Sequence, residues 1–179
     1  PVVYSKVWRS VVKALSIRPP WAWAILSAEK RIENRSRADG RMPSLCSYRG
    51  PLLIHASAGC TKREHGEASA WMVAKGLATW ELLHASLPYV PHLTLTPRGG
   101  IVGVCNVVAF IGPDGFLQGF ESPSGWDKAK NVDKRWHIAG SYGLVLADVR
   151  PLPFTPFKGA LGLFNVPDDI ALPLLGGGQ

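Results

Sequence analysis

The strongest constraint on the fold is one long apolar segment, GGIVGVCNVVAFIG, at residues 99–112. Its length and apolar character predict a buried strand. A glycine inside a strand can mark a bulge or a sharp coil of the strand, so we expect such a feature at Gly103. Bends of this kind fit a sheet that curls towards a small closed barrel.

Shorter strands are expected on both sides of this segment, where apolar or alternating stretches are bounded by turn residues. They cover residues 13–17, 51–57, 91–97, 141–153 and 159–167. In the segment 51–57, alternation places Leu53, His55 and Ser57 on one face. The remaining stretches are expected to be extended or looped at 30–36, turn-rich at 37–50 and looped at 113–135.

Two helical regions are expected. The first begins at Pro19 and Pro20, because the first turn of a helix needs no N–H group from them. Helical spacing of Trp21, Ile25 and Ala28 then predicts a helix that ends near residue 28. The second covers residues 62–87, with a break at Gly76 and an apolar stripe made of Val73, Leu77, Trp80, His84 and Leu87.

Length and composition fit one domain spanning residues 1–179. Many short strands with few helices predict an α+β fold with a mostly antiparallel sheet. No apolar run reaches the roughly 20 residues that a bilayer span requires. The first residues, PVVYSKVWRSVVK, lack an apolar stretch of signal-peptide length, so we expect a cytoplasmic protein with no membrane partner.

The charge balance favours a polyanionic partner. The net charge is +7 and the pI is about 9.6, and a basic surface attracts phosphates. The three cysteines cannot all pair and share no CxxC spacing, so we expect free thiols. The spacing of Cys46, His55, Cys60 and His65 fits no standard zinc pattern, so we expect no metal and no cofactor.

A charged cluster follows the first helix in the stretch AEKRIENR, residues 28–35. Lys30, Glu33 and Arg35 stand within six positions of one another. One interpretation is a structural ion pair that pins this segment to the sheet. The other is the polar rim of a binding pocket. Surface ion pairs stabilise a fold by only about 0–1 kcal/mol, so stability alone is a weak reason for three charges at this spacing.

Several blocks of the chain together resemble the ASCH-domain proteins of the PUA-like superfamily. These blocks are ALSIRPPWAWAIL, AEKRIENR, RGPLLIHAS and WHIAGSYGLVLADVRPLPFTPFKGALGLF. The family motif G-x-K-x-x-E-x-R is matched by Lys30, Glu33 and Arg35, with Ala28 in place of the glycine. The resemblance implies a small, mostly antiparallel β-barrel with flanking helices, a core at about 12–167 and a helical insertion at about 62–87.

The resemblance also implies a function. ASCH domains are generally regarded as RNA- or nucleic-acid-binding modules, so we expect RNA, another single-stranded nucleic acid or a modified nucleotide as the partner. Some small members are enzymes, either nucleoside amidohydrolases or ribonucleases. The amidohydrolases carry a nucleophilic threonine where this chain has Glu33. If this protein is an enzyme, Lys30, Glu33 and His55 are the candidate catalytic residues, with Lys30 and His55 as acid and base of a ribonuclease.

The candidate nucleic-acid contacts are cations for phosphates, aromatic rings for unpaired bases and polar groups for base edges. They are Arg18, Trp21, Lys30, Glu33, Arg35, Tyr48, Arg49, His55, Ser57, Trp136, His137 and Tyr142. The competing interpretations are a core position for Trp21 and a hydrogen-bonded, half-buried histidine for His55. For the others they are a solvated turn at Tyr48 and Arg49, and edge packing at Trp136, His137 and Tyr142. A further alternative is a protein-interaction adaptor that uses the 62–87 helix, which would need an apolar exposed face.

Overall fold

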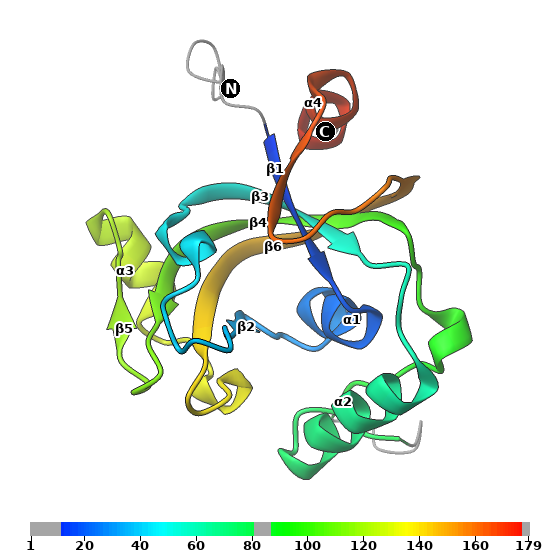
Figure 1. Ribbon diagram of the computed structural model, residues 1–179, viewed down its shortest axis with the longest axis horizontal. Helices are drawn as coiled ribbons and strands as arrows, with labels where there is room; N and C mark the ends of the chain where they lie inside the picture. The colour runs from blue at the N-terminus through cyan, green and yellow to red at the C-terminus, as the bar shows by residue number, and fades with distance from the viewer. Residues whose placement is uncertain (1–11, 81–86, 177–179) are drawn as a thin grey trace.

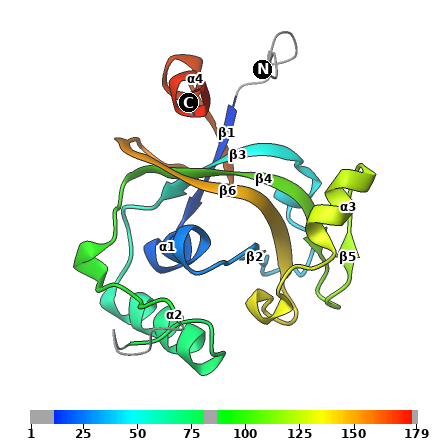
Figure 2. The same cartoon turned by 180° about the vertical axis from the view of Figure 1, so that it is seen from behind.

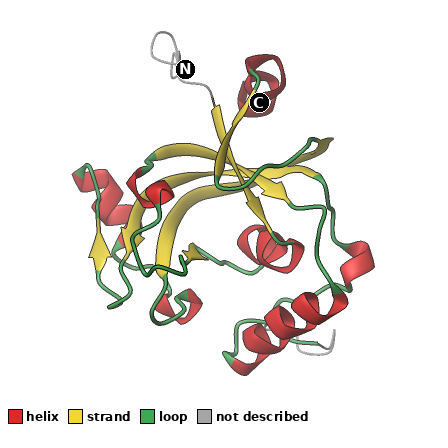
Figure 3. Cartoon of the chain, viewed as in Figure 1, coloured by secondary structure: helices red, strands yellow, loops and turns green. Residues whose placement is uncertain are grey.

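The computed structural model describes residues 12–80 and 87–176. Figure 1 shows the chain and Figure 3 its secondary structure, with strands in one curved layer and helices around it. The strands are β1 Val12–Ile17, β2 Ile32–Arg35, β3 Gly50–Ala56, β4 Gly100–Ile111, β5 Leu117–Gln118, β6 Tyr142–Pro156 and β7 Leu163–Val166. The helices are α1 Pro19–Ser27, α2 Lys62–Ala74, α3 Pro123–Ala129 and α4 Asp168–Gly176.

All seven strands belong to one mixed sheet. Its order is β2-β6-β4-β3-β1-β7, and β5 pairs with β4. Among the strand pairs of the described residues, only β1–β3 is parallel, so the predicted α+β class with a mostly antiparallel sheet is confirmed. The predicted barrel is not closed, because β2 and β7 end the sheet without pairing with each other.

The predicted irregularity near Gly103 is confirmed. The pairing of β4 with β6 shifts register between Ile101 and Gly103. A Cβ atom at Gly103 would stand 2.5 Å from Cδ2 of Leu26 and 3.0 Å from the Arg150 carbonyl oxygen. A glycine is needed here because α1 and β6 both press against the strand at this point.

The sheet forms an arch with a different helix on each side, as Figures 1 and 2 show from opposite directions. On the concave side, Leu15 and Ile17 of β1 pack with Ile25 of α1. On the other side, Ala14 of β1 packs with Ala171 of α4. Successive side chains of β1 therefore alternate between two core clusters, one on each face of the sheet.

Most of the predicted elements are present, but the helix expected at 62–87 is much shorter. It ends at Ala74, and Gly76 has a left-handed φ of 63°. Leu77 is buried beyond the helix end, so the predicted helical stripe does not exist in residues 77–80. His84 lies outside the described residues. None of the described helices has the length and apolarity required to cross a membrane.

Two further predictions were wrong. Residues 91–97 contain a 3₁₀ turn at Leu93–Leu95 in place of a strand, because the alternating residues there have no strand beside them to pair with. The predicted loop at 113–135 contains β5 and α3. The C-terminal helix α4 also had no counterpart in the sequence-based assignment.

Candidate functional site

The end of α1 positions the charged motif. The backbone N–H groups of Ala28 and Lys30 both donate to the Ala24 carbonyl, at 2.9 and 3.1 Å. Glu29 between them has a left-handed φ of 55°, as is usual for the residue just after a helix end. Arg31 Nη1 donates to the Ile25 carbonyl at 2.8 Å. The chain therefore reverses tightly and enters β2 alongside the helix.

Lys30 and Glu33 form a buried ion pair. Only 1% of Lys30 is exposed, and its Nζ donates to Glu33 Oε2 at 2.6 Å and to the Ile32 carbonyl at 2.5 Å. Burial lowers the pKa of the Lys30 amine below its usual range, and the carboxylate of Glu33 opposes that shift. The Lys30 amine is therefore enclosed in this conformation and does not reach a phosphate in solution.

Arg35 is the member of the motif that reaches the surface. Its Nη2 lies 3.1 Å from Glu33 Oε1 and donates to the Ser16 carbonyl at 2.8 Å. Its side chain is 28% exposed. The Nε atom is buried without a hydrogen-bond partner among the described residues. A guanidinium has five N–H donors, so Arg35 is held from the inside while part of its donor capacity is unused.

The pairing of β2 with β6 places Tyr142 beside Arg35. Asn34 holds the segment that precedes β6 in place. Its Nδ2 donates to the Trp136 carbonyl at 2.8 Å, and its Oδ1 accepts from the Ile138 N–H at 2.9 Å. Sequence reasoning did not identify Asn34 as a positioning residue. A half-buried tyrosine next to a half-buried arginine is the arrangement that can stack a base and hold its phosphate.

Trp21 is half-buried between the motif and α2. Lys30 Nζ lies 5.6 Å from the centroid of its ring, and Trp71 of α2 meets it edge-on at 5.6 Å. Trp71 also lies 6.2 Å from the ring of Trp136. Trp71 was missed in the sequence, although it lies on the buried side of the helical insertion. Trp136 is fully buried, so its predicted role as a surface for base stacking is wrong.

His55 lies on the opposite face of the sheet from Lys30. Its Nε2 donates to the Phe157 carbonyl at 2.9 Å, and its Nδ1 therefore accepts from the Ser16 hydroxyl at 3.1 Å. The ring packs edge-on against Phe164 at 5.7 Å. His55 is a buried, fully hydrogen-bonded histidine. The expectation that it acts together with Lys30 as an acid–base pair does not agree with this placement.

Arg18 and Ser57 gather at a different place, the loop in front of α2. Arg18 Nη1 donates to Glu64 Oε2 at 3.0 Å and to the Gly59 carbonyl at 3.3 Å. Ser57 Oγ donates to the same carbonyl at 3.1 Å. These contacts tie α2 to the start of α1, and Arg18 remains more than half exposed.

Arg49 connects β3 to the loop that follows β5. Its Nη1 donates to the Cys46 and Tyr48 carbonyls at 2.8 and 2.6 Å, and its Nε donates to the Gly119 carbonyl at 2.5 Å. The guanidinium lies 5.5 Å from the centroid of Phe110. The hydroxyl of Tyr48 donates to the Pro51 carbonyl. Arg49 is half-buried and lies on the same side of the sheet as Arg35.

The remaining candidates have local partners. His137 Nε2 donates to the Ser141 carbonyl at 2.9 Å. The charges of the 127–135 stretch are largely paired, for example Lys130 with Asp127 at 2.7 Å and Arg135 with Asp133 at 2.7 Å. Within the described residues, no three His, Cys, Asp or Glu side chains are grouped closely enough to hold a metal ion.

The arched mixed sheet and the charged motif that follows α1 define a protein of PUA-like fold. A family model described as the ASCH domain matches residues 15–144, which is more than half of the chain. This protein therefore belongs to the ASCH domain family, as the resemblance of the motif and strand blocks predicted. No curated protein sequence matches it significantly.

Solved structures similar to this chain include three of the ASCH protein from Zymomonas mobilis. A tyrosine-to-phenylalanine variant is 13% identical with a TM-score of 0.44, and covers 93% of this chain and 98% of its own. The unsubstituted protein is 14% identical with a TM-score of 0.43, covering 92% of this chain and 93% of its own. A serine-to-alanine variant is 14% identical with a TM-score of 0.43, covering 92% of this chain and 94% of its own.

Proposed function

We propose that this protein binds nucleic acid, preferably single-stranded RNA or a modified nucleotide, at the motif that follows α1. The observation that carries the proposal is Arg35, which is anchored to buried Glu33 yet remains 28% exposed beside Tyr142. A cation with unused donors next to an aromatic ring suits a phosphate and an unpaired base. Membership of the ASCH family, commonly proposed to bind RNA, supports the same function.

The motif residues have different roles in this proposal. Arg35 contacts the phosphate or a base edge, and Tyr142 offers a ring to the base. Lys30 and Glu33 stay inside and hold the guanidinium in place, since the carboxylate bridges Lys30 at 2.6 Å and Arg35 at 3.1 Å. A single-stranded or flipped base is the target, because a base inside a duplex presents no free face for stacking.

A hydrolase that acts on a modified nucleoside or on RNA is the second candidate. The observation that favours it is the lowered pKa of Lys30 in a buried pair with a carboxylate, since perturbed titratable groups concentrate at catalytic sites. The amidohydrolase form lacks the threonine nucleophile, whose position is taken by Glu33. The ribonuclease form would have to work without His55, which lies on the other face of the sheet.

The adaptor alternative has little support. The exposed positions of α2 are Lys62, Arg63, Glu67, Ala70 and Ala74. This face is charged or small, whereas docking of a protein partner would need an apolar patch. The basic, half-buried surface near Arg35 remains the better candidate for a partner.

One gel experiment separates binding from cleavage. Labelled single-stranded RNA and DNA are incubated with the protein at 50 and 200 mM salt, with and without a metal chelator. Binding predicts intact strands whose retardation weakens as salt rises, because phosphate contacts release counterions. Strands shortened in the presence of chelator, and left intact by Lys30→Met, would establish a metal-independent nuclease instead. Intact strands that are not retarded at 50 mM salt would contradict the proposal.

A further inference from the structure

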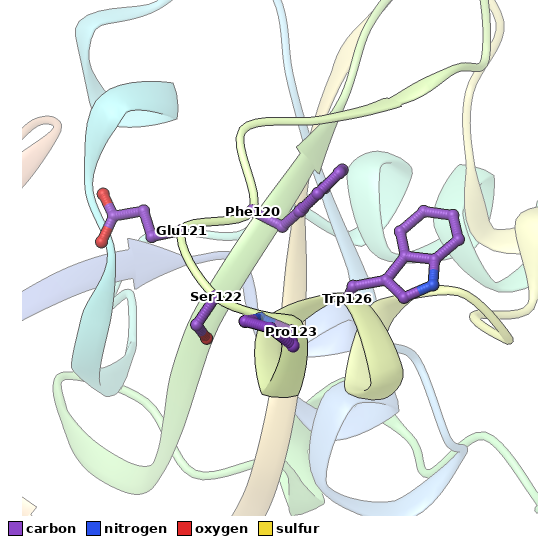
Figure 4. A pocket seen from close by; sticks show the side chains of 5 residues that line it. All are labelled: Phe120, Glu121, Ser122, Pro123 and Trp126. Atoms are coloured by element: carbon purple, nitrogen blue, oxygen red, sulfur yellow. The ribbon is translucent and has the colours of Figure 1, made fainter.

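A row of aromatic rings and arginines leads from the motif to a pocket at the start of α3. The pocket has a volume of about 490 Å³ and is shown in Figure 4. It is lined by Phe120, Glu121, Ser122, Pro123 and Trp126. The pocket lies apart from Lys30 and Glu33 in sequence, and none of its residues was a candidate in the sequence.

Strand register builds the first half of the row. Arg35 of β2 is paired with Tyr142 of β6, and Leu144 of β6 is paired with Phe110 of β4. Directly paired residues share a face, and so do residues two apart on one strand. Arg35, Tyr142 and Phe110 therefore line one side of three adjacent strands. The rings of Phe110 and Tyr142 lie 6.4 Å apart.

Arg49 builds the second half of the row. Its guanidinium lies over Phe110 at 5.5 Å and donates to the Gly119 carbonyl at 2.5 Å, directly before Phe120. The rings of Phe120 and Trp126 lie 5.2 Å apart at an interplanar angle of 54°. Phe120 is 45% exposed and Trp126 is 42% exposed. Two large rings are thus left open to solvent at the end of a row of contacts that begins at Arg35.

The chemistry of the row indicates its occupant. Single-stranded nucleic acids are bound where aromatic rings stack on successive bases and cations follow the backbone. The row supplies Arg35, Tyr142, Phe110, Arg49, Phe120 and Trp126 in that order. An arginine over a ring can also stack on a base through its planar face. Figure 4 shows Glu121 pointing away from the two rings, so its carboxylate does not block them.

We propose that Phe120 and Trp126 form a second base-stacking site, linked to the motif by Arg49, so that this protein binds a strand of several nucleotides. The site rests on the proposed function, because Arg35 anchors the same strand. The nucleotide next to Arg35 stacks at Tyr142, and nucleotides further along reach Phe120 and Trp126. The preferred ligand is therefore a single-stranded oligonucleotide and not an isolated nucleotide.

The test compares short and long strands. Fluorescein-labelled oligouridines of 4 and 12 nucleotides, which do not fold, are titrated at 50 mM salt while fluorescence anisotropy is recorded. We expect tighter binding of the 12-mer. Trp126→Ala and Phe120→Leu should each weaken the 12-mer about tenfold, the typical effect of losing one stacking partner. Binding of the 4-mer should change less than twofold, and Trp126→Phe should keep most of the 12-mer affinity.

The control is Phe154→Ala, since Phe154 is an equally exposed ring elsewhere on the sheet, at the far end of β6. It should leave both affinities unchanged, and melting curves of every variant check that the fold is kept. If the 12-mer binds with the same affinity to the Trp126 and Phe120 variants, the second site is wrong. In that case, the proposed function would still be upheld if Arg35→Gln abolished binding of both the 4-mer and the 12-mer. Absence of binding to either strand would overturn both.

Discussion

At the scale of single residues, the motif is a chain of charges that passes from the core to the surface. Lys30 is buried, Glu33 accepts from it and forms an ion pair with Arg35, and Arg35 is partly exposed. Removing two charges from water costs free energy, and the attraction within a single ion pair offsets only part of this desolvation cost. Here the Ile32 carbonyl supplies Lys30 with a further acceptor. The buried pair therefore serves to hold Arg35 in one orientation.

Replacing Lys30 by methionine should lower the free energy of unfolding by about 3 kcal/mol at pH 7, because Glu33 and the Ile32 carbonyl lose their donor. The folded-state pKa of Lys30 lies below the ordinary 10.5. At a pH between the folded-state pKa of Lys30 and 10.5, the unfolded chain binds more protons than the folded chain. The free energy of unfolding of the wild type therefore rises with pH in this range. The stability difference between wild type and Lys30→Met should therefore grow as pH approaches 10.5. Urea unfolding at pH 7 and 10 measures it, and a difference that shrinks would be contrary to this account.

The three cysteines should react very differently. Burial raises the pKa of all three thiols, that of Cys105 to about 12. Cys46 and Cys105 are enclosed in the core, whereas Cys60 is only partly buried and open to a reagent. With a disulfide reagent at pH 8, we expect one fast thiol in the native protein, lost in Cys60→Ser, and two more after denaturation. Two or more fast thiols in the native state would show that the core around Cys46 and Cys105 is open.

At the scale of elements, local patterns were predictable and pairings were not. The helix α1 followed from Pro19, Pro20 and the spacing of apolar residues, and β4 followed from its apolar length. The short α3 has proline, serine and glycine in its first turn, so its propensity is weak. Residues 91–97 alternate like a strand but find no partner. The neighbours Tyr142 and Arg35 depend on strand register, which no local pattern encodes.

The same division holds for the candidate site. The charged residues of AEKRIENR could be identified from their spacing. The spacing did not reveal that Lys30 is buried while Arg35 is partly exposed. The placement of His55 beneath Phe157 depends on a loop 102 residues away in the sequence. Phe120 and Trp126 gave no signal, because isolated aromatic residues in a loop do not reveal whether they will be covered.

The loop between β6 and β7 packs tightly over His55. A Cβ atom at Gly159 would lie 2.5 Å from the His55 ring and 2.5 Å from Ser16 Oγ. Gly159→Ala should therefore lower the free energy of unfolding by about 1–3 kcal/mol, because the histidine must shift and lose hydrogen bonds. Chemical denaturation measures the change. Gly59→Ala is the matched control, since a Cβ there meets nothing within 4 Å, and an equal effect of both substitutions would refute the packing argument.

At the scale of the whole molecule, the arched sheet separates two differently packed sides. The convex side carries α4 and the buried His55, and its contacts stabilise the fold. The concave side carries α1 (Figure 2), and Phe110 and Tyr142 pack against the same core cluster. Ala129 of α3 packs with Ala109 and Val145, whose side chains lie on the other face of the sheet. A net charge of +7 favours a polyanionic partner but does not select a site. In the proposed function, the site is the place where Arg35 and the half-buried ring of Tyr142 lie side by side.

The most direct test of the account compares Arg35→Gln with Arg37→Gln. Both remove one positive charge from the same segment, but Arg37 is exposed and pairs only with Asp39 within the described residues. Affinity for a labelled 12-nucleotide oligouridine is measured by anisotropy between 50 and 200 mM salt. We predict at least tenfold weaker binding and a salt slope smaller by about 1 for Arg35→Gln, with nearly wild-type binding for Arg37→Gln. Equal affinities of the two variants, with both folded, would contradict the assignment of Arg35 as the anchor of the bound strand.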